Sequence, residues 1–195
     1  MSPWNRNIHY HDLVLRSAPV GCSRALDVGC GNGILARRIG SHCPDVTAID
    51  TDHATLARAV AATASQAGIT FVRGDVMTYP FQEGSFDFIT AVASLHHLPL
   101  MPALKRLRNL LRPQGVLAVI GLYRMRTLSD FVIGALAVPT SLALRCINRH
   151  CEVAAPVRDP VETFHEIRRA CDFVLPGARL RRELLFRYSM IWRKP

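Results

Sequence analysis

The amino-acid sequence predicts an α/β fold in which helices cover both faces of a doubly wound, mostly parallel sheet. Short apolar runs alternate along the chain with segments of helical length, which is the pattern of parallel strands joined by helices. The last two apolar runs flank a very short connection, which indicates an antiparallel hairpin at the sheet edge. A length of 195 residues suits a single domain, 1–195, that buries a full core without disulfides.

Each expected strand is an apolar run bounded by glycine or polar residues. Along the chain, the parallel strands are expected at 24–28, 45–49, 69–72, 86–91 and 115–120. The helices between them are expected at 33–41, 54–66 and about 102–111. Gly68 suits the C-cap of the second of these helices. The terminal hairpin is expected from residues 178–184 and 187–192.

A long insertion, residues 122–156, separates the fifth strand from the last helix. Within it, residues 131–144 carry no charge and lie between Asp130 and Arg145. This stretch is shorter than the roughly 20 residues that a bilayer requires, and Pro139 interrupts it. We therefore expect an apolar helical lid that packs on the domain.

The chain carries a formal net charge of +9 at pH 7, which suggests an anionic neighbour. Its arginines are nevertheless scattered, without the dense run or the interleaved aromatic residues of a nucleic-acid-binding patch. Nucleic acid is therefore not expected as a partner, whereas weak contact with a membrane surface stays open.

The six cysteines contain no Cys-x-x-Cys, and no apolar signal segment leads the chain. Both observations favour reduced thiols in a cytoplasmic protein. Cys146, His150 and Cys151 lack a second spaced pair of ligands, so no metal site is expected.

The most specific feature is the turn after the first strand, where residues 29–33 read Gly-Cys-Gly-Asn-Gly. Glycines allow the backbone to turn tightly and to approach a ligand closely. A dinucleotide fingerprint, Gly-x-Gly-x-x-Gly, would need its third glycine at Ile34. No Gly-Lys-Ser or Gly-Lys-Thr follows, so a phosphate loop is excluded as well.

This turn resembles motif I of the class I S-adenosylmethionine-dependent methyltransferases, in the methyltransferase type 11 branch that includes ubiquinone-biosynthesis-type enzymes. The resemblance implies a Rossmann-like sheet with the terminal hairpin at its edge, and S-adenosylmethionine as the cofactor. Residues 86–98 are similar to motif IV of the small-molecule members of this family. They lack the Asn-Pro-Pro-Tyr and Asp-Pro-Pro-Tyr tetrapeptides of amino-directed nucleic-acid methylases.

The carboxyl ends of the strands are expected to meet at one crevice that holds the cofactor. Asp50 lies about twenty residues beyond the glycine turn, where a carboxylate can accept from both ribose hydroxyls. The resemblance assigns Asp75 and Val76 to the adenine ring and Asp27 to the turn and the cofactor's amino group. The expected cofactor-binding residues are Asp27, Gly29, Cys30, Gly31, Asn32, Gly33, Asp50, Thr51, Asp75, Val76 and Ala91.

His96 and His97 follow the fourth strand, where the transferred methyl group would be. Imidazole titrates near neutral pH, so either side chain could remove a proton from a hydroxyl, an amine or a carbon acid. A pair that merely orders the loop is an equal alternative. In the related motif the first histidine lies nearer the strand end, which favours His96.

The N-terminal segment, residues 1–20, is expected to form a second lid. Related enzymes close their substrate pocket with such a segment, although a simple docking helix fits nearly as well. A frayed terminus is normally poorer in aromatic and imidazole side chains. The candidates for substrate binding are Trp4, His9, Tyr10 and His11.

These features together predict a methyltransferase that acts on a hydrophobic or aromatic small molecule, with secondary metabolites among the candidates. An apolar lid over an aromatic N-terminal segment favours such an acceptor because ligand pockets are lined mostly by apolar side chains. Two alternatives stay open: a cofactor-binding protein without transferase activity, and a membrane-associated lipid or quinone methyltransferase.

Overall fold

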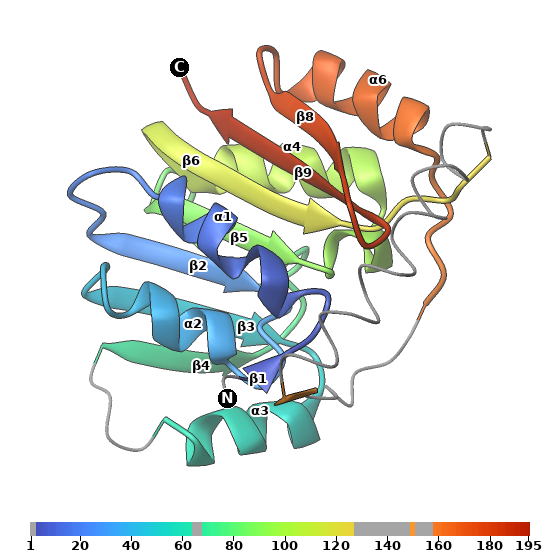
Figure 1. Ribbon diagram of the computed structural model, residues 1–195. Helices are drawn as coiled ribbons and strands as arrows, with labels where there is room; N and C mark the ends of the chain where they lie inside the picture. The colour runs from blue at the N-terminus through green and yellow to red at the C-terminus, as the bar shows by residue number, and fades with distance from the viewer. Residues whose placement is uncertain (1–2, 64–67, 127–148, 151–157) are drawn as a thin grey trace.

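The computed structural model describes residues 3–63, 68–126, 149–150 and 158–195. At its centre lies a seven-stranded sheet in the order β4-β3-β2-β5-β6-β9-β8 (Figure 1). Strands β4, β3, β2, β5 and β6 are parallel, and β9 runs antiparallel to both β6 and β8. This arrangement confirms the predicted fold class. The strands are β2 (Arg24–Val28), β3 (Asp45–Asp50), β4 (Ile69–Arg73), β5 (Phe86–Val92), β6 (Leu111–Gly121), β8 (Arg179–Glu183) and β9 (Arg187–Arg193).

Helices pack on both faces of the sheet and bury two separate hydrophobic clusters. The N-terminal helices contribute Val14, Leu35 and Leu56 to one cluster, and the later helices contribute Leu104 and Ile167 to the other. Two buried layers around one sheet are the doubly wound arrangement. The helices are α1 (His11–Arg16), α2 (Ile34–Ile39), α3 (His53–Ala61), α4 (Leu100–Leu110) and α6 (Phe164–Val174), with 3-10 turns η1 (Ile8–Tyr10) and η2 (Leu95–His97). A separate parallel pair joins β1 (Pro3–Trp4) to β7 (Arg149–His150).

The first two helices of the sheet are shorter than the predicted ranges 33–41 and 54–66. Helix α2 begins after Gly33, whose φ of 72° is left-handed and cannot continue a right-handed helix. Helix α3 begins after Asp52, whose side chain accepts a hydrogen bond from the Thr55 N–H at 2.7 Å and caps the helix.

The prediction for Leu111 was wrong, because this residue begins strand β6 and does not end the preceding helix. Leu111 lies opposite Phe86 in the sheet, and the pairing resumes at Val116 opposite Phe88 after a register shift. Gln114, in the irregular stretch, has a φ of 64°. The strand pairing therefore overrides the apolar helical pattern that runs through Leu111.

Most of the predicted apolar lid, residues 122–156, lies outside the described residues. After the gap, the chain enters α6 through Thr163, whose hydroxyl and backbone N–H form a capping box with Glu166. Among the helices of the described ranges, none is both long enough and apolar enough to cross a membrane.

Asp87 fixes the starts of β2 and β5 relative to each other. Its Oδ2 accepts from the backbone N–H groups of Ser23, at 3.0 Å, and Arg24, at 2.9 Å. Its Oδ1 accepts from Arg112 at 3.0 Å. These bonds hold the pKa of Asp87 below its usual value against the opposing effect of burial. Because the strands are rigid, pinning their starts also sets the positions of their carboxyl ends.

Candidate functional site

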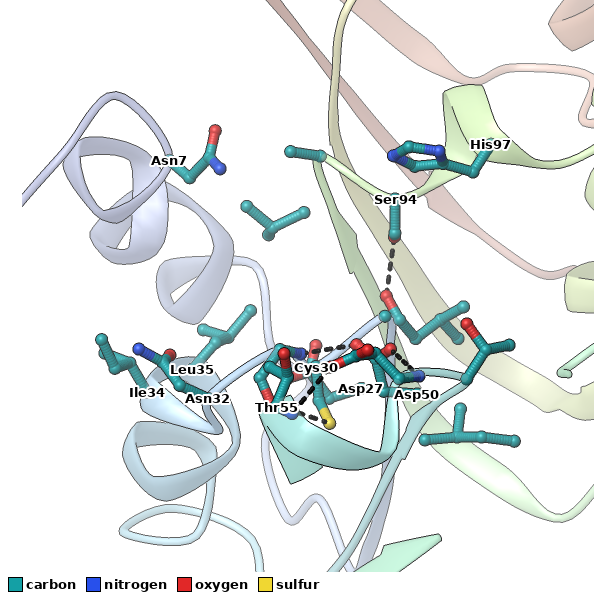
Figure 2. Close-up of a pocket in the computed structure, with 18 of the residues that line it drawn as sticks. Asn7, Asp27, Cys30, Asn32, Ile34, Leu35, Asp50, Thr55, Ser94 and His97 are labelled. Atoms are coloured by element: carbon teal, nitrogen blue, oxygen red, sulfur yellow. Dashed lines mark hydrogen bonds between the residues drawn. The ribbon is translucent and has the colours of Figure 1, made fainter. Parts of the chain in front are cut away.

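A cavity of about 350 Å³ opens at the carboxyl ends of β2, β3, β4 and β5 (Figure 2). Its walls come from the glycine turn after β2, the residues after β3 and β4, the loop after β5, and the N-terminal segment. In the view of Figure 2, Asn7 and His97 lie on opposite sides of the pocket, with Asp27 and Asp50 below both. Ligands of open α/β sheets bind at this edge, where the strand order reverses.

The glycine turn has a left-handed backbone at Gly29, Gly31 and Gly33, with φ values of 68°, 54° and 72°. Such values are strained for residues with a Cβ atom. The backbone N–H of Gly29 donates to the Ile49 carbonyl at 2.8 Å, which joins the turn to β3. A Cβ atom on Gly29 would lie 2.4 Å from the Cβ of Ser94, so the turn and the loop after β5 touch at this point.

Asp50, at the end of β3, holds the glycine turn from the other side. Its Oδ2 accepts from the Gly31 N–H at 2.8 Å, and its Oδ1 accepts from the Asp52 N–H at 3.0 Å. A carboxylate oxygen has two lone pairs, so each oxygen can accept one more hydrogen bond. Thr51 follows on the cavity rim and is exposed.

Asp75 and Val76, just beyond β4, pair an acceptor with an apolar wall. Asp75 is exposed, and its Oδ1 accepts from the Met77 N–H at 2.9 Å. Val76 is only 3% exposed and belongs to the hydrophobic core. A flat ring that carries a hydrogen-bond donor at its edge would suit this pair.

Asp27 places a buried carboxyl group against the floor of the cavity. Its Oδ1 accepts from the Thr90 hydroxyl at 2.7 Å, whereas its Oδ2 is buried without a hydrogen-bond partner among the described residues. Burial raises the pKa of Asp27 to about 7, an effect that the bond from Thr90 opposes and the nearby charge of Asp50 reinforces. A cationic ligand group would satisfy the free oxygen and favour the ionised form.

The loop after β5 brings His97 to the cavity. Ala93, with a φ of 53°, and Ser94, whose hydroxyl donates to the Val28 carbonyl at 2.6 Å, lead into the turn η2. His97 is one of the residues that line the cavity. Burial is the main cause that lowers its pKa, and the charge of Arg158 adds to it. The imidazole of His97 is therefore biased toward the neutral form that accepts a proton.

His96 does not line this cavity, as far as the described residues define it. Its ring lies against that of His97, with centroids 4.1 Å apart, and its Nδ1 is buried with no partner among the described residues. Burial, followed by the charges of His97 and Arg187, lowers the pKa of His96 to about 4. Of the two predicted histidines, the structure thus brings His97 to the ligand site.

The four predicted N-terminal residues occupy different environments. His11 lines the cavity, is 4% exposed, and has an Nδ1 atom without a partner among the described residues. Burial, helped by Arg38, lowers its pKa to about 4. Tyr10 is buried and donates its hydroxyl proton to a backbone carbonyl of the hairpin turn. Trp4 lies in the hydrophobic core, and His9 is exposed with its ring edge-on to that of Tyr10.

Three N-terminal residues that the sequence did not single out also line the cavity: Asn5, Asn7 and Ile8. The Oδ1 of Asn7 accepts from Nη2 and Nε of Arg187 at 2.8 and 3.1 Å. Asn5 accepts from the N–H groups of Asn7 and Ile8, both at 2.8 Å, and so starts the turn η1. Asparagine side chains often accept from backbone N–H groups about two residues further along the chain, so Asn5 was the available sequence signal for this turn.

The remaining predicted cofactor residues divide into two groups. Cys30, Gly31 and Asn32 line the cavity together with the aspartates described above. Gly33 and Ala91 are buried behind the wall and are not among the described residues that line it. Further lining residues that the sequence did not suggest are Val28, Ile34, Leu35, Ile49, Asp52, Thr55, Gly74, Val92, Ala93, Ser94 and Leu98.

In the described part of the chain, no group of three or more histidine, cysteine, aspartate or glutamate side chains is arranged to hold a metal ion. Cys146 and Cys151 lie outside the described residues.

Comparison with known proteins agrees with the fold and the glycine turn. A family model for a methyltransferase domain matches residues 26–119. An uncharacterized methyltransferase of Mycobacterium tuberculosis is 37% identical over 195 residues, which cover 99% of this chain and 98% of that protein. A demethylmenaquinone methyltransferase of Staphylococcus aureus is 35% identical over 102 residues, which cover 50% of this chain and 42% of that protein.

Among solved structures, a SAM-dependent methyltransferase from Aquifex aeolicus has a similar fold, with a TM-score of 0.65 and 16% identity. The match covers 95% of this chain and 89% of that chain. In the sheet, β9 is inserted antiparallel between β6 and β8. The relative from Mycobacterium tuberculosis is similar to this chain over nearly the whole length of both proteins. The chain belongs to the class I S-adenosylmethionine-dependent methyltransferases.

Proposed function

We propose that this protein transfers a methyl group from S-adenosylmethionine to an apolar or aromatic small molecule whose reacting group approaches His97. One observation carries the proposal. A single cavity joins the glycine turn, Asp50 and Asp75 to His97 and the N-terminal segment. A cofactor held by the first set and an acceptor next to His97 would therefore share one cavity.

The residues of the cavity fit S-adenosylmethionine in charge and in shape. Asp27 offers a buried oxygen without a described partner, which suits the cationic amino group of the cofactor. Asp50 has a free lone pair on each oxygen for the two ribose hydroxyls. Asp75 and Val76 suit the amino group and the ring of adenine.

The acceptor side of the cavity combines apolar side chains with a few polar ones. Ile8, Val92 and Leu98 line it close in sequence to Asn7 and His97. Pockets of this composition take apolar ligands and use a few polar groups to orient them. The relative from Staphylococcus aureus is named for an apolar aromatic substrate, demethylmenaquinone, which supports an aromatic acceptor here.

When bound, S-adenosylmethionine supplies an electrophilic methyl group on its sulfonium sulfur. We assign His97 the removal of a proton from the acceptor, because a lowered pKa keeps its imidazole neutral. The N-terminal segment and the loop after β5 align the acceptor and exclude water. We further propose that the protein acts in the cytoplasm, with at most weak contact with membrane surfaces and no nucleic-acid partner.

The direct test is formation of S-adenosylhomocysteine in the presence of a panel of phenols and hydroquinones. Turnover with any of them supports the proposal. Tight cofactor binding without turnover on the whole panel would favour the alternative of a cofactor-binding protein. Co-sedimentation with liposomes would instead favour a membrane-associated lipid or quinone methyltransferase.

Asp50→Ala should weaken the binding of S-adenosylmethionine by about 1.5–3 kcal/mol, which is the scale of hydrogen bonds to a charged group. The reason is the loss of both acceptors for the ribose and of the bond that holds the Gly31 N–H. Isothermal titration calorimetry measures the change. Asp45→Ala is the matched control, since Asp45 is on the same strand but at its opposite end, paired with Arg24 at 3.1 Å.

An unchanged affinity in Asp50→Ala would remove Asp50 from the cofactor site. The same titration with NAD should give no measurable binding, because Ile34 stands where the dinucleotide fingerprint has its third glycine. Saturable micromolar binding of NAD in this cavity would contradict the assignment of the cofactor.

Cofactor affinity should fall as the pH drops below about 7. The carboxyl of Asp27 has its pKa raised to about 7, so it becomes protonated in this range and loses its attraction for the cationic amino group. The loss should approach about tenfold per pH unit well below that pKa. Titrations between about pH 5.5 and 7.0 keep most of the ligand's α-amino group protonated, since the pKa of such a group is about 7.7–8.0. Asp27→Asn should bind weakly with little pH dependence, and an equally steep dependence in this variant would sink the assignment.

A further inference from the structure

Two cysteines meet at the edge of the sheet opposite the cavity. Cys22 precedes β2 and Cys43 precedes β3, and these two parallel strands are paired with Arg24 opposite Asp45. Two residues upstream, the same register brings Cys22 next to Cys43. Their sulfur atoms lie 2.9 Å apart, with the Cys22 thiol donating to the sulfur of Cys43. Two neighbouring strands thus bring the two thiols into direct contact.

Neither thiol takes part in the site described above. Both precede the strands whose far ends line the cavity, and both are buried, Cys22 with 8% and Cys43 with 2% exposure. No third metal ligand joins them within the described residues. Burial raises the pKa of both thiols, so they are protonated near neutral pH and react with a peroxide only through a small thiolate fraction.

We propose that Cys22 and Cys43 form a site of oxidative modification, at which a hydroperoxide converts the two thiols into a disulfide. The two S–H bonds break and one S–S bond forms, which removes two protons and two electrons. The hydroperoxide accepts them, and its O–O bond breaks to give water and an alcohol, or two waters from hydrogen peroxide. The disulfide closes residues 22–43, a loop that contains β2, the glycine turn and α2. This proposal does not depend on the proposed function.

The test treats the full-length protein with hydrogen peroxide and follows its mass. To exclude the cysteines outside the described residues, the starting protein carries Cys146→Ser and Cys151→Ser. The expected result is a loss of about 2 Da, reversed by dithiothreitol. Trypsin should then release a cross-linked pair of peptides, 17–24 and 39–58, each of which holds one cysteine.

The disulfide should also raise the midpoint of thermal unfolding by about 5–10 °C, because a closed loop of this length restricts the unfolded chain. Cys22→Ser and Cys43→Ser should each abolish the mass loss and the thermal shift. Cys171→Ser is the matched control, since Cys171 is equally buried but has the sulfur of Met190 as its neighbour. It should keep both effects.

Two results would overturn the proposal. In the first, peroxide adds oxygen atoms to Cys22 or Cys43 and no cross-linked peptide forms. In the second, both thiols are alkylated in full when the peroxide-treated protein is unfolded without a reductant. Because both readouts are independent of methyl transfer, failure here leaves the proposed function untouched.

Discussion

Replacing His97 by alanine should lower turnover by roughly 10²–10⁴-fold, the contribution of a general base, and should leave cofactor affinity nearly intact. The reason is its place on the cavity, just beyond β5, together with a pKa lowered by burial and by Arg158. Single-turnover assays and calorimetry on the same preparation separate the two effects.

His96→Phe is the control for this prediction. His96 precedes His97 and its ring packs against that of His97, so phenylalanine keeps the ring contact while it removes the second imidazole. We expect near-normal turnover. A large loss in His96→Phe with normal turnover in His97→Ala would assign the base to His96. Normal turnover in both would mean that the enzyme acts by alignment alone, on an acceptor that is already nucleophilic at neutral pH.

The pH dependence gives a second readout for His97. A base must be neutral, so the rate should fall as the pH drops through the pKa of His97. Because that pKa is lowered, the fall should begin below the range of a free imidazole. Arg158→Gln should raise the pKa of His97 and so move the acid limb of the rate profile to higher pH. Arg158 contributes a nearby positive charge and donates to the His97 carbonyl at 3.5 Å. If His97 has only a structural role, the acid limb of the rate profile should stay at the same pH in Arg158→Gln.

The fold could be predicted from the sequence to the extent that it depends on local patterns. Each strand of the parallel sheet is an apolar run, and the glycine turn is visible in five residues, 29–33. The start of β6 was missed because Leu111 is held by its pairing with Phe86, a contact between residues far apart in the sequence. An apolar residue after a helical run cannot reveal such a partner.

The site could be predicted where strand ends determine it. Asp50 and Asp75 meet at one cavity because parallel strands bring their carboxyl ends to the same edge of the sheet. The choice between two adjacent histidines was beyond sequence reasoning, since it depends on the turn η2 and on Leu95, which is 2% exposed and anchors that turn. The place of Asn7 depends on Arg187, 180 residues away.

Gly29→Ala should produce the second large effect, a loss of about 2–5 kcal/mol in stability together with much weaker cofactor binding. Two causes add up. The φ of 68° is strained for alanine, and the new Cβ would lie 2.4 Å from the Cβ of Ser94. To relieve the contact, the glycine turn or the loop that carries His97 must move. Thermal unfolding and calorimetry measure the two consequences.

Gly84→Ala isolates the first of these causes. Gly84 has a φ of 63°, but a Cβ there would meet nothing within 4 Å. Gly84→Ala should lower the free energy of unfolding by about 1–2 kcal/mol, which is the backbone strain alone, and should leave the cofactor affinity unchanged.

Ser94→Gly in the Gly29→Ala background isolates the second cause, because it removes the Cβ that clashes and leaves the Ser94 Cα at 3.7 Å. The double variant should therefore be more stable than the sum of the single losses allows, and strictly additive losses would show that the two loops do not press on each other.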